Sequence, residues 1–225
     1  MAPSNRSGEK GSKRPPGEGI HLLEDHLVRL TLSAVYFGFA LDLSKLQAAL
    51  AMPTDRLPPV GHRLCLIVSR RGAFRCQPSP VCQEALLFAD IGLAAGPVDP
   101  QDPFLYHKTT RREIYAAALA ESPGAGDVLL FNEKVEITES TIATAAFEID
   151  GALSTPPLRC GLLPGVCRDR LLAEGRLREW VVTVAEALRC GEVYLMNALR
   201  GIQRVRILPP APGGSEAAPV TFGNR

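Results

Sequence analysis

Three short segments carry residue types whose spacing could support chemistry. In the segment 104–112, FLYHKTTRR, an apolar and aromatic stretch leads to a single lysine, Lys108, directly before a predicted helix. A helix N-terminus carries partial positive charge, which would lower the pKa of this lysine. Lysines that form Schiff bases need a lowered pKa. Read alone, the segment also fits an exposed loop lysine.

The second segment, 160–168 with sequence CGLLPGVCR, is a Gly/Pro turn that leads into a predicted helix. The backbone N–H groups of Val166 and Cys167 at that helix start would have no intrahelical acceptor. Such groups bind anions and phosphates. Because many loops before helices look similar, this signal is only moderately specific.

The third segment, 133–143 with sequence EKVEITESTIA, places a carboxylate before a predicted strand, where it could pair with a cationic ring nitrogen. Taken alone, Glu136 and Glu139 are expected to be solvated. The four histidines are scattered singly, and the six cysteines lack zinc-like spacing. We therefore expect no metal site, and thiols in a reducing compartment.

The length, composition and net charge of the chain argue against several classes of protein. The chain has 225 residues, 46% of them hydrophobic, and a net charge of +1, which argues against a nucleic-acid binder or a polybasic membrane-surface protein. No apolar run reaches the roughly 20 residues that a membrane-spanning helix needs. Residues 1–19 lack the apolar core of a secretory signal, so they are predicted to be a disordered lead-in and the protein to be cytoplasmic.

Periodicity and turn residues predict an α+β fold with two domains. Residues 20–95 form the predicted small domain, 96–103 a Pro-rich linker, 104–208 the large domain and 209–225 a mobile tail. The predicted helices cover 25–37, 44–51, 109–120, 166–174 and 185–190. The predicted strands cover 64–69, 73–77, 85–93, 128–131, 145–149, 181–184, 193–196 and 205–208.

Read in order along residues 20–208, these segments resemble a known family. The order HLxRL, HKTTRR, NExxExTExTIA, PPLxCGLLPGV and NxLRG is similar to the class IV (fold type IV) pyridoxal-phosphate enzymes. That family includes branched-chain and D-amino-acid aminotransferases and 4-amino-4-deoxychorismate lyase. The HKTTRR and NxLRG variants are most similar to the lyase group, including lyase domains fused to aminobenzoate synthase.

The resemblance implies a pyridoxal 5'-phosphate site. Lys108 would form the Schiff base with the cofactor and then act as the catalytic base. Glu139 would bond to the pyridine nitrogen and keep it protonated. The remaining residues would hold the phosphate: Arg29, Val166, Cys167, Asn197 and Ala198.

The reaction implied by the closest motifs is conversion of 4-amino-4-deoxychorismate to 4-aminobenzoate and pyruvate, a step of folate biosynthesis. An aminotransferase acting on a branched-chain or D-amino acid would use the same residues, and a degenerate, non-catalytic member is the third possibility. The resemblance also implies a homodimer acting on a small molecule, with an aminobenzoate synthase component as a further candidate partner.

The chain departs from the family pattern at several positions. Thr144 replaces the usual Asn and Ser140 the usual Gly, while Cys167 and Ala198 replace hydroxyl residues that would bond to phosphate. The family's opening strands have no counterpart, because the lead-in occupies their place. The small N-terminal domain is therefore expected to be incomplete.

Overall fold

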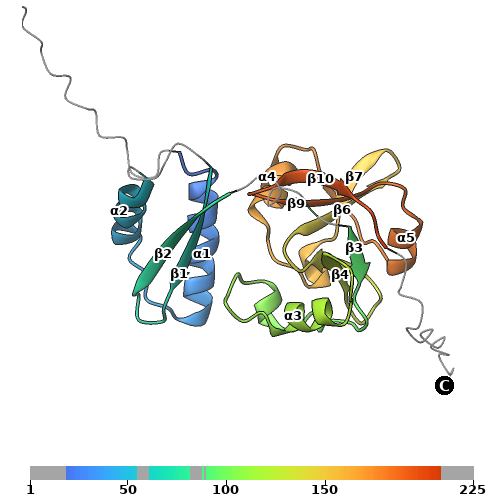
Figure 1. The fold of residues 1–225 in the computed structure, drawn as a ribbon, viewed down its shortest axis with the longest axis horizontal. Coiled ribbons are helices and arrows are strands. Elements are labelled where there is room, and N and C mark those ends of the chain that lie inside the picture. Colours follow the sequence, from blue (N-terminus) through green and yellow to red (C-terminus); the bar gives the residue numbers. More distant parts are fainter. Residues whose placement is uncertain (1–18, 55–60, 82–87, 89, 209–225) are drawn as a thin grey trace, which may run out of the picture.

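The computed structural model describes residues 19–54, 61–81, 88 and 90–208. Figure 1 shows two lobes: a small lobe built from the first two helices and strands, and a large lobe that contains the remaining elements. Except for Gly19, the predicted lead-in lies outside the described residues, as does the predicted tail. Within the described residues, no helix is long and apolar enough to cross a membrane.

The small lobe packs two helices, α1 (Leu23–Phe37) and α2 (Leu43–Thr54), against a hairpin of β1 (His62–Val68) and β2 (Phe74–Pro80). Its core contains Leu27, Leu46 and Leu50. The helix predicted at 25–37 and the hairpin are confirmed. The predicted end of the second helix before Pro53 is wrong, because α2 continues to Thr54.

The large lobe contains two sheets. The first has the order β3-β4-β5, from β3 (Ile91–Leu93), β4 (Asp127–Phe131) and β5 (Ile137–Ser140). The second has the order β10-β9-β6-β7-β8. Its strands are β6 (Thr144–Ile149), β7 (Ala152–Thr155), β8 (Arg178–Glu179), β9 (Val193–Asn197) and β10 (Gly201–Val205).

Short helices connect these strands. They are η2 (Pro103–Leu105), α3 (Glu113–Ala120), η3 (Leu158–Cys160), α4 (Val166–Ala173) and α5 (Val184–Arg189). The α+β fold is therefore confirmed. The division of the chain at 96–103 stays a prediction; in that segment Val98 forms a β-bridge with Asn132.

Several predicted boundaries are wrong. The strand predicted at 181–184 is reduced to a single β-bridge, between Thr183 and Glu136, because Thr183 and Glu186 make a capping box that starts α5 there. Of the strand predicted at 205–208, Val205 ends β10 and Ile207 forms a β-bridge with Ile91, while β5, β7 and β8 were not predicted. Of the strand predicted at 85–93, the described part forms only β3, and residues 82–87 and 89 lie outside the described residues. Finally, α3 begins four residues later than predicted, at Glu113.

Candidate cofactor site

Lys108 lies in the loop between η2 and α3. Its side chain is accessible to solvent, yet it lies deep enough among protein atoms that desolvation lowers its pKa, and Arg29 and Arg112 lower the pKa further. The expected low pKa is therefore present, but the reason given for it from the sequence is wrong. Since α3 starts only at Glu113, no helix N-terminus lies directly after the lysine.

Glu139 lies on β5 and is only 5% exposed, so the expectation that it is solvated is wrong. Its Oε1 accepts a hydrogen bond from the Tyr115 hydroxyl at 2.8 Å. Burial raises the pKa of this carboxyl to about 7, and the bonds from Tyr115 and from the Leu163 backbone, with the charge of Lys108, oppose that rise. The carboxyl can therefore exchange a proton near neutral pH.

The turn before α4 is built around Gly165, the N-cap residue, which offers no side-chain acceptor to the first amides of the helix. A Cβ at this position would come within 2.7 Å of Thr144 Oγ1, so the turn requires glycine. The guanidinium of Arg29, from α1, donates to the Pro164 carbonyl oxygen at 3.1 Å. The structure thus brings an arginine of the small lobe to the turn that directly precedes Val166 and Cys167.

Asn197 and Ala198 lie at the turn between β9 and β10. Asn197 Oδ1 accepts hydrogen bonds from the backbone N–H groups of Leu199 and Arg200, and its Nδ2 donates to the Ile142 carbonyl oxygen at 3.3 Å. The side chain therefore shapes this turn and ties it to the loop that follows β5. Ala198 is half-buried in the same turn.

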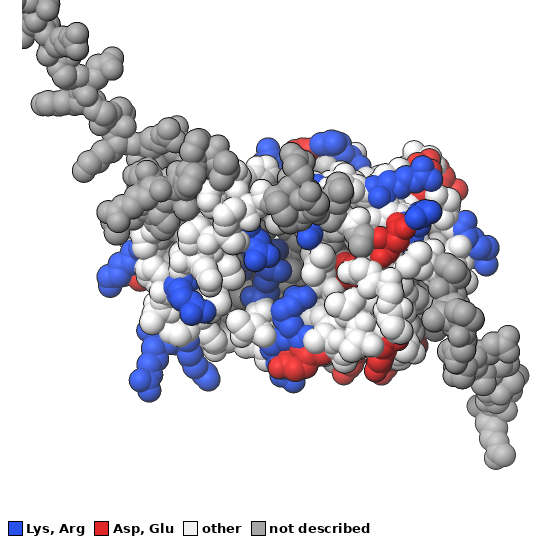
Figure 2. Space-filling view, in the orientation of Figure 1, with Lys and Arg blue, Asp and Glu red and all other residues white. Residues whose placement is uncertain are grey.

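These positions fit a molecule with an anionic group at one end and a basic ring nitrogen at the other. Arg29 and the α4 amides supply donors for a phosphate. Glu139 supplies a buried carboxyl for a ring nitrogen, and Lys108 supplies an amine whose lowered pKa suits it to a covalent bond with an aldehyde. Figure 2 shows Lys and Arg side chains gathered along the hollow between the lobes, as an anionic ligand requires. The residues present therefore fit pyridoxal phosphate.

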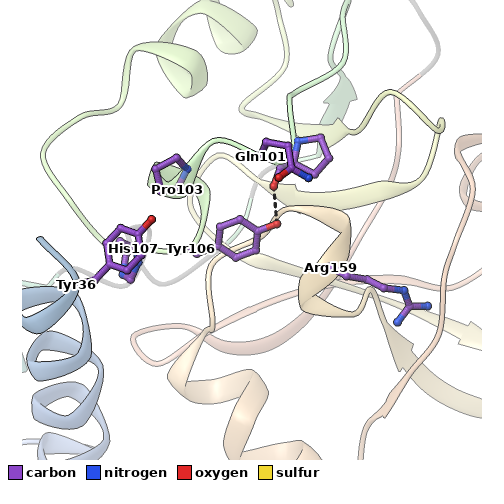
Figure 3. A pocket seen from close by; sticks show the side chains of 7 residues that line it. Tyr36, Gln101, Pro103, Tyr106, His107 and Arg159 are labelled. Carbon is purple, nitrogen blue, oxygen red and sulfur yellow. Dashed lines mark hydrogen bonds between the residues drawn. The ribbon is translucent and has the colours of Figure 1, made fainter.

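A separate open pocket of about 470 Å³ adjoins the site (Figure 3). Tyr36 and His107 lie close together on one side, Tyr106 donates to the Pro100 carbonyl oxygen at 2.7 Å, and the Arg159 side chain points away from the aromatic rings. Lys108, Glu139 and Arg29 are not among its lining residues. We therefore do not assign this pocket to the cofactor.

Two residues of the site, Tyr115 and Arg112, were not predicted from the sequence. The Arg112 guanidinium lies 4.5 Å from the centre of the Tyr115 ring, and it also donates to the Thr141 carbonyl oxygen. Both residues follow Lys108 within one short segment, HKTTRREIY, and they lie three residues apart. Residues three apart at the start of a helix lie on the same face, and this spacing is the signal that could have revealed them.

Comparison with known proteins gives relatives for both the sequence and the fold. A Schizosaccharomyces pombe protein named provisionally as an aminodeoxychorismate lyase is 36% identical over 118 residues, which cover 49% of this chain and 51% of that protein. The chain thus matches about half the length of that relative.

Two solved structures match more of the chain. A Mesorhizobium loti protein named provisionally as an amino-acid aminotransferase is 35% identical with a TM-score of 0.78, covering 86% of this chain and 95% of that one. The PLP-bound form of a hypothetical aminotransferase from Mycobacterium tuberculosis is 26% identical with a TM-score of 0.71, covering 85% and 79%.

The chain also matches the sequence model of one protein family, which is described as amino-transferase class IV. The match covers residues 16–208, which include every residue of the candidate site. Enzymes of this family use pyridoxal phosphate. The match extends over both lobes, and we conclude that the chain belongs to the amino-transferase class IV family.

Proposed function

We propose that the chain is a pyridoxal-phosphate-dependent lyase that converts 4-amino-4-deoxychorismate to 4-aminobenzoate and pyruvate. The proposal of a cofactor-dependent reaction rests on one observation. Lys108, Glu139 and Arg29 converge around the start of α4. The lyase reaction is favoured by the similarity to the S. pombe protein and by the HKTTRR and NALRG motifs.

The chain's own residues have distinct roles in this proposal. Lys108 would hold the cofactor covalently, and Glu139 would bond to its ring nitrogen. Arg29, with the amides of Val166 and Cys167, would hold its phosphate, and the turn of Asn197 and Ala198 would close the phosphate site. When bound, pyridoxal phosphate supplies an electron sink for the carbon that bears the substrate amine.

Proton transfer would belong to Lys108. Desolvation by surrounding protein atoms and the neighbouring guanidinium groups lower its pKa, so a larger fraction of its Nζ is neutral and able to accept a proton near neutral pH. In the lyase reaction, Nζ, once displaced by the substrate amine, would take the proton from the substrate carbon that bears that amine. The C–O bond to the enolpyruvyl group would then break as the ring becomes aromatic, and the proton would pass to the departing enolpyruvate, which becomes pyruvate.

An aminotransferase is the second candidate, and one observation favours it. The Mesorhizobium protein, named for that activity, matches over 95% of its length at 35% identity. The two reactions differ in their need for a keto acid. A lyase releases pyruvate from 4-amino-4-deoxychorismate with no keto acid added, whereas an aminotransferase consumes a keto acid as amino acceptor.

The first experiment locates the cofactor. The protein is incubated with pyridoxal phosphate, reduced with borohydride and analysed by peptide mass spectrometry. We expect a pyridoxyl adduct at Lys108 that is absent from Lys108→Arg and unchanged in Lys134→Arg, which alters an exposed lysine. Adducts spread over surface lysines, or none, would contradict the proposed site and favour the degenerate, non-catalytic member.

A homodimer is proposed as the assembly. Four exposed apolar side chains follow one face of α1, with Val35 75% exposed and Leu32 64% exposed; the other two are Val28 and Tyr36. An apolar helix face of this kind marks an interaction site. Sedimentation should give a dimer for the wild type and a monomer for Leu32→Glu, and a monomeric wild type would refute the proposal. An aminobenzoate synthase partner and a cytoplasmic location stay predictions.

A further inference from the structure

The Glu139 carboxyl is held by a tyrosine that no motif assigns. Tyr115 lies on α3 and is 8% exposed, and its hydroxyl donates to Glu139 Oε1 at 2.8 Å. The backbone N–H of Leu163 also bonds to the carboxyl. The Tyr115 hydroxyl, from α3, and a backbone N–H of the turn before α4 therefore both face a carboxyl that lies on β5.

The Tyr115 ring is itself held in place from the solvent side. The Arg112 guanidinium lies 4.5 Å from its centre and donates a hydrogen bond to the Thr141 carbonyl oxygen, two residues beyond Glu139. Arg112 therefore links the segment after Lys108 to the end of β5 across the face of the tyrosine. The ring has little freedom to turn its hydroxyl away from Glu139.

We propose that Tyr115 is a positioning residue, which orients the Glu139 carboxylate and keeps it ionised so that Glu139 can hold a proton on the cofactor's ring nitrogen. The proposal rests on the proposed cofactor site and adds a residue to it. Tyr115 would touch neither cofactor nor substrate. Its effect would pass entirely through Glu139.

The charge balance around Glu139 explains why such a donor matters. Burial raises the pKa of the carboxyl, and the Tyr115 hydroxyl lowers it by bonding to the ionised form. Burial also raises the pKa of Tyr115, so its hydroxyl stays a donor. The other charged groups that face Glu139 are Lys108 and Arg112, from the loop before α3, and Arg29, from α1.

Those three cations would remain in a Tyr115→Phe variant, so the loss is partial. A hydrogen bond to a charged group is strong enough to move a pKa by about one unit. We therefore expect the pKa of the Glu139 carboxyl to rise by about one unit in Tyr115→Phe. When cofactor is bound, the proton shared between Glu139 and the ring nitrogen would move toward the glutamate oxygen.

Two measurements test this, one of which needs no cofactor. In the cofactor-free protein, ¹³C NMR of labelled glutamate carboxyls follows the titration of Glu139, assigned with Glu139→Gln. With pyridoxal phosphate labelled at its ring nitrogen, ¹⁵N NMR reports whether that nitrogen is protonated. The matched control is Tyr194→Phe, which removes a tyrosine–glutamate bond of 3.3 Å to Glu192 elsewhere in the large lobe.

The expected result is a higher Glu139 pKa and a smaller protonated fraction of the ring nitrogen in Tyr115→Phe, with Tyr194→Phe like the wild type. Identical titration of Glu139 in both variants would overturn the proposal. If the wild type binds no pyridoxal phosphate, the proposed function fails, and the carboxyl titration still decides the role of Tyr115.

A second variant covers the case in which Tyr115→Phe does not fold. Replacing the four tyrosines by 3-fluorotyrosine keeps every ring and hydroxyl but makes each hydroxyl a stronger donor. The Glu139 pKa should then fall relative to the wild type. An unchanged or higher value would contradict the proposal.

Discussion

The two lobes differ in how they bury their residues and in what they contribute to the site. In the large lobe, the described strands β4, β5 and β6 are buried at almost every position. In the small lobe, β1 and β2 mix half-buried and exposed positions, and among the described residues the core cluster has three buried members. Of the proposed cofactor residues, only Arg29 comes from the small lobe.

This difference assigns separate tasks to the lobes. Lys108, Glu139 and the start of α4 are attached to the better-buried lobe, so their relative positions are fixed by a packed core. The small lobe contributes one cation and one side of the hollow. Because local stability follows buried apolar contacts, the small lobe should open more readily than the large one.

The largest effects are expected from two substitutions that shorten buried side chains, one in the core of each lobe. Phe147 is fully buried in the large lobe, and Leu46 is fully buried in the small lobe. Phe147→Ala should cost about 3–5 kcal/mol and Leu46→Ala about 2–5 kcal/mol of the free energy of unfolding. We expect the first to unfold the whole chain and the second to open the small lobe alone.

Hydrogen–deuterium exchange distinguishes these outcomes. In Leu46→Ala, amides of α1, α2, β1 and β2 should lose protection while those of β4, β5, β6 and β9 keep it. In Phe147→Ala, protection should fall in both lobes together. If Leu46→Ala also exposes the large-lobe strands, the lobes unfold as one unit and the comparison fails.

The second test concerns the buried carboxyl of the large lobe. Glu139 has a pKa raised from 4.5 to about 7, so between these values the folded protein binds more protons than the unfolded chain. The stabilisation from this proton is therefore complete below pH 4.5 and is lost as pH rises through about 7. Denaturation of the cofactor-free protein should show stability falling over this window.

Glu139→Gln is the matched variant, because it keeps the shape of the side chain but cannot titrate. The difference in unfolding free energy between wild type and Glu139→Gln should change steadily with pH inside the window and level off outside it. A constant difference would mean that Glu139 stays ionised throughout. The carboxyl would then be better solvated than its 5% exposure indicates.

The parts of the fold that sequence could predict are those governed by local rules. The helix α1 was predicted from the spacing of its apolar residues. The turn between β6 and β7 also follows a local rule, because Asp150 and Gly151 both have positive φ, as a two-residue hairpin loop requires. The prediction of a strand at 181–184 was wrong, because the capping box of Thr183 and Glu186 starts α5 there and outweighs the strand preference of three valines.

The site divides in the same way. Lys108 and the α4 turn were found because their motifs are contiguous in sequence. The burial of Glu139 and its bond to Tyr115 could not be found, because Tyr115 and Glu139 are 24 residues apart and meet only when α3 packs against β4, the strand next to β5. Likewise, the pKa of Lys108 is lowered by desolvation first, and then by Arg29 and Arg112, rather than by a local helix start.

The smallest effect is expected from a substitution that tests whether the small lobe binds the cofactor. Arg29→Ala removes the one cofactor contact proposed for that lobe, so the affinity for pyridoxal phosphate should fall by about 10- to 100-fold, as for a charge-assisted hydrogen bond. Pyridoxal, which lacks the phosphate, should bind the variant and the wild type equally well. Arg71→Ala, at the exposed tip of the hairpin, is the control.

The ratio of the affinity for pyridoxal phosphate to the affinity for pyridoxal distinguishes two roles of Arg29, binding of the phosphate and attachment of the small lobe to the large one. If Arg29 acts on the phosphate, only pyridoxal phosphate loses affinity, and the ratio falls. If its bond to the Pro164 carbonyl oxygen matters because it holds the lobes together, both ligands lose affinity equally and the ratio stays constant. In that case the small lobe would position the α4 turn instead of binding the cofactor, and the whole phosphate site would belong to the large lobe.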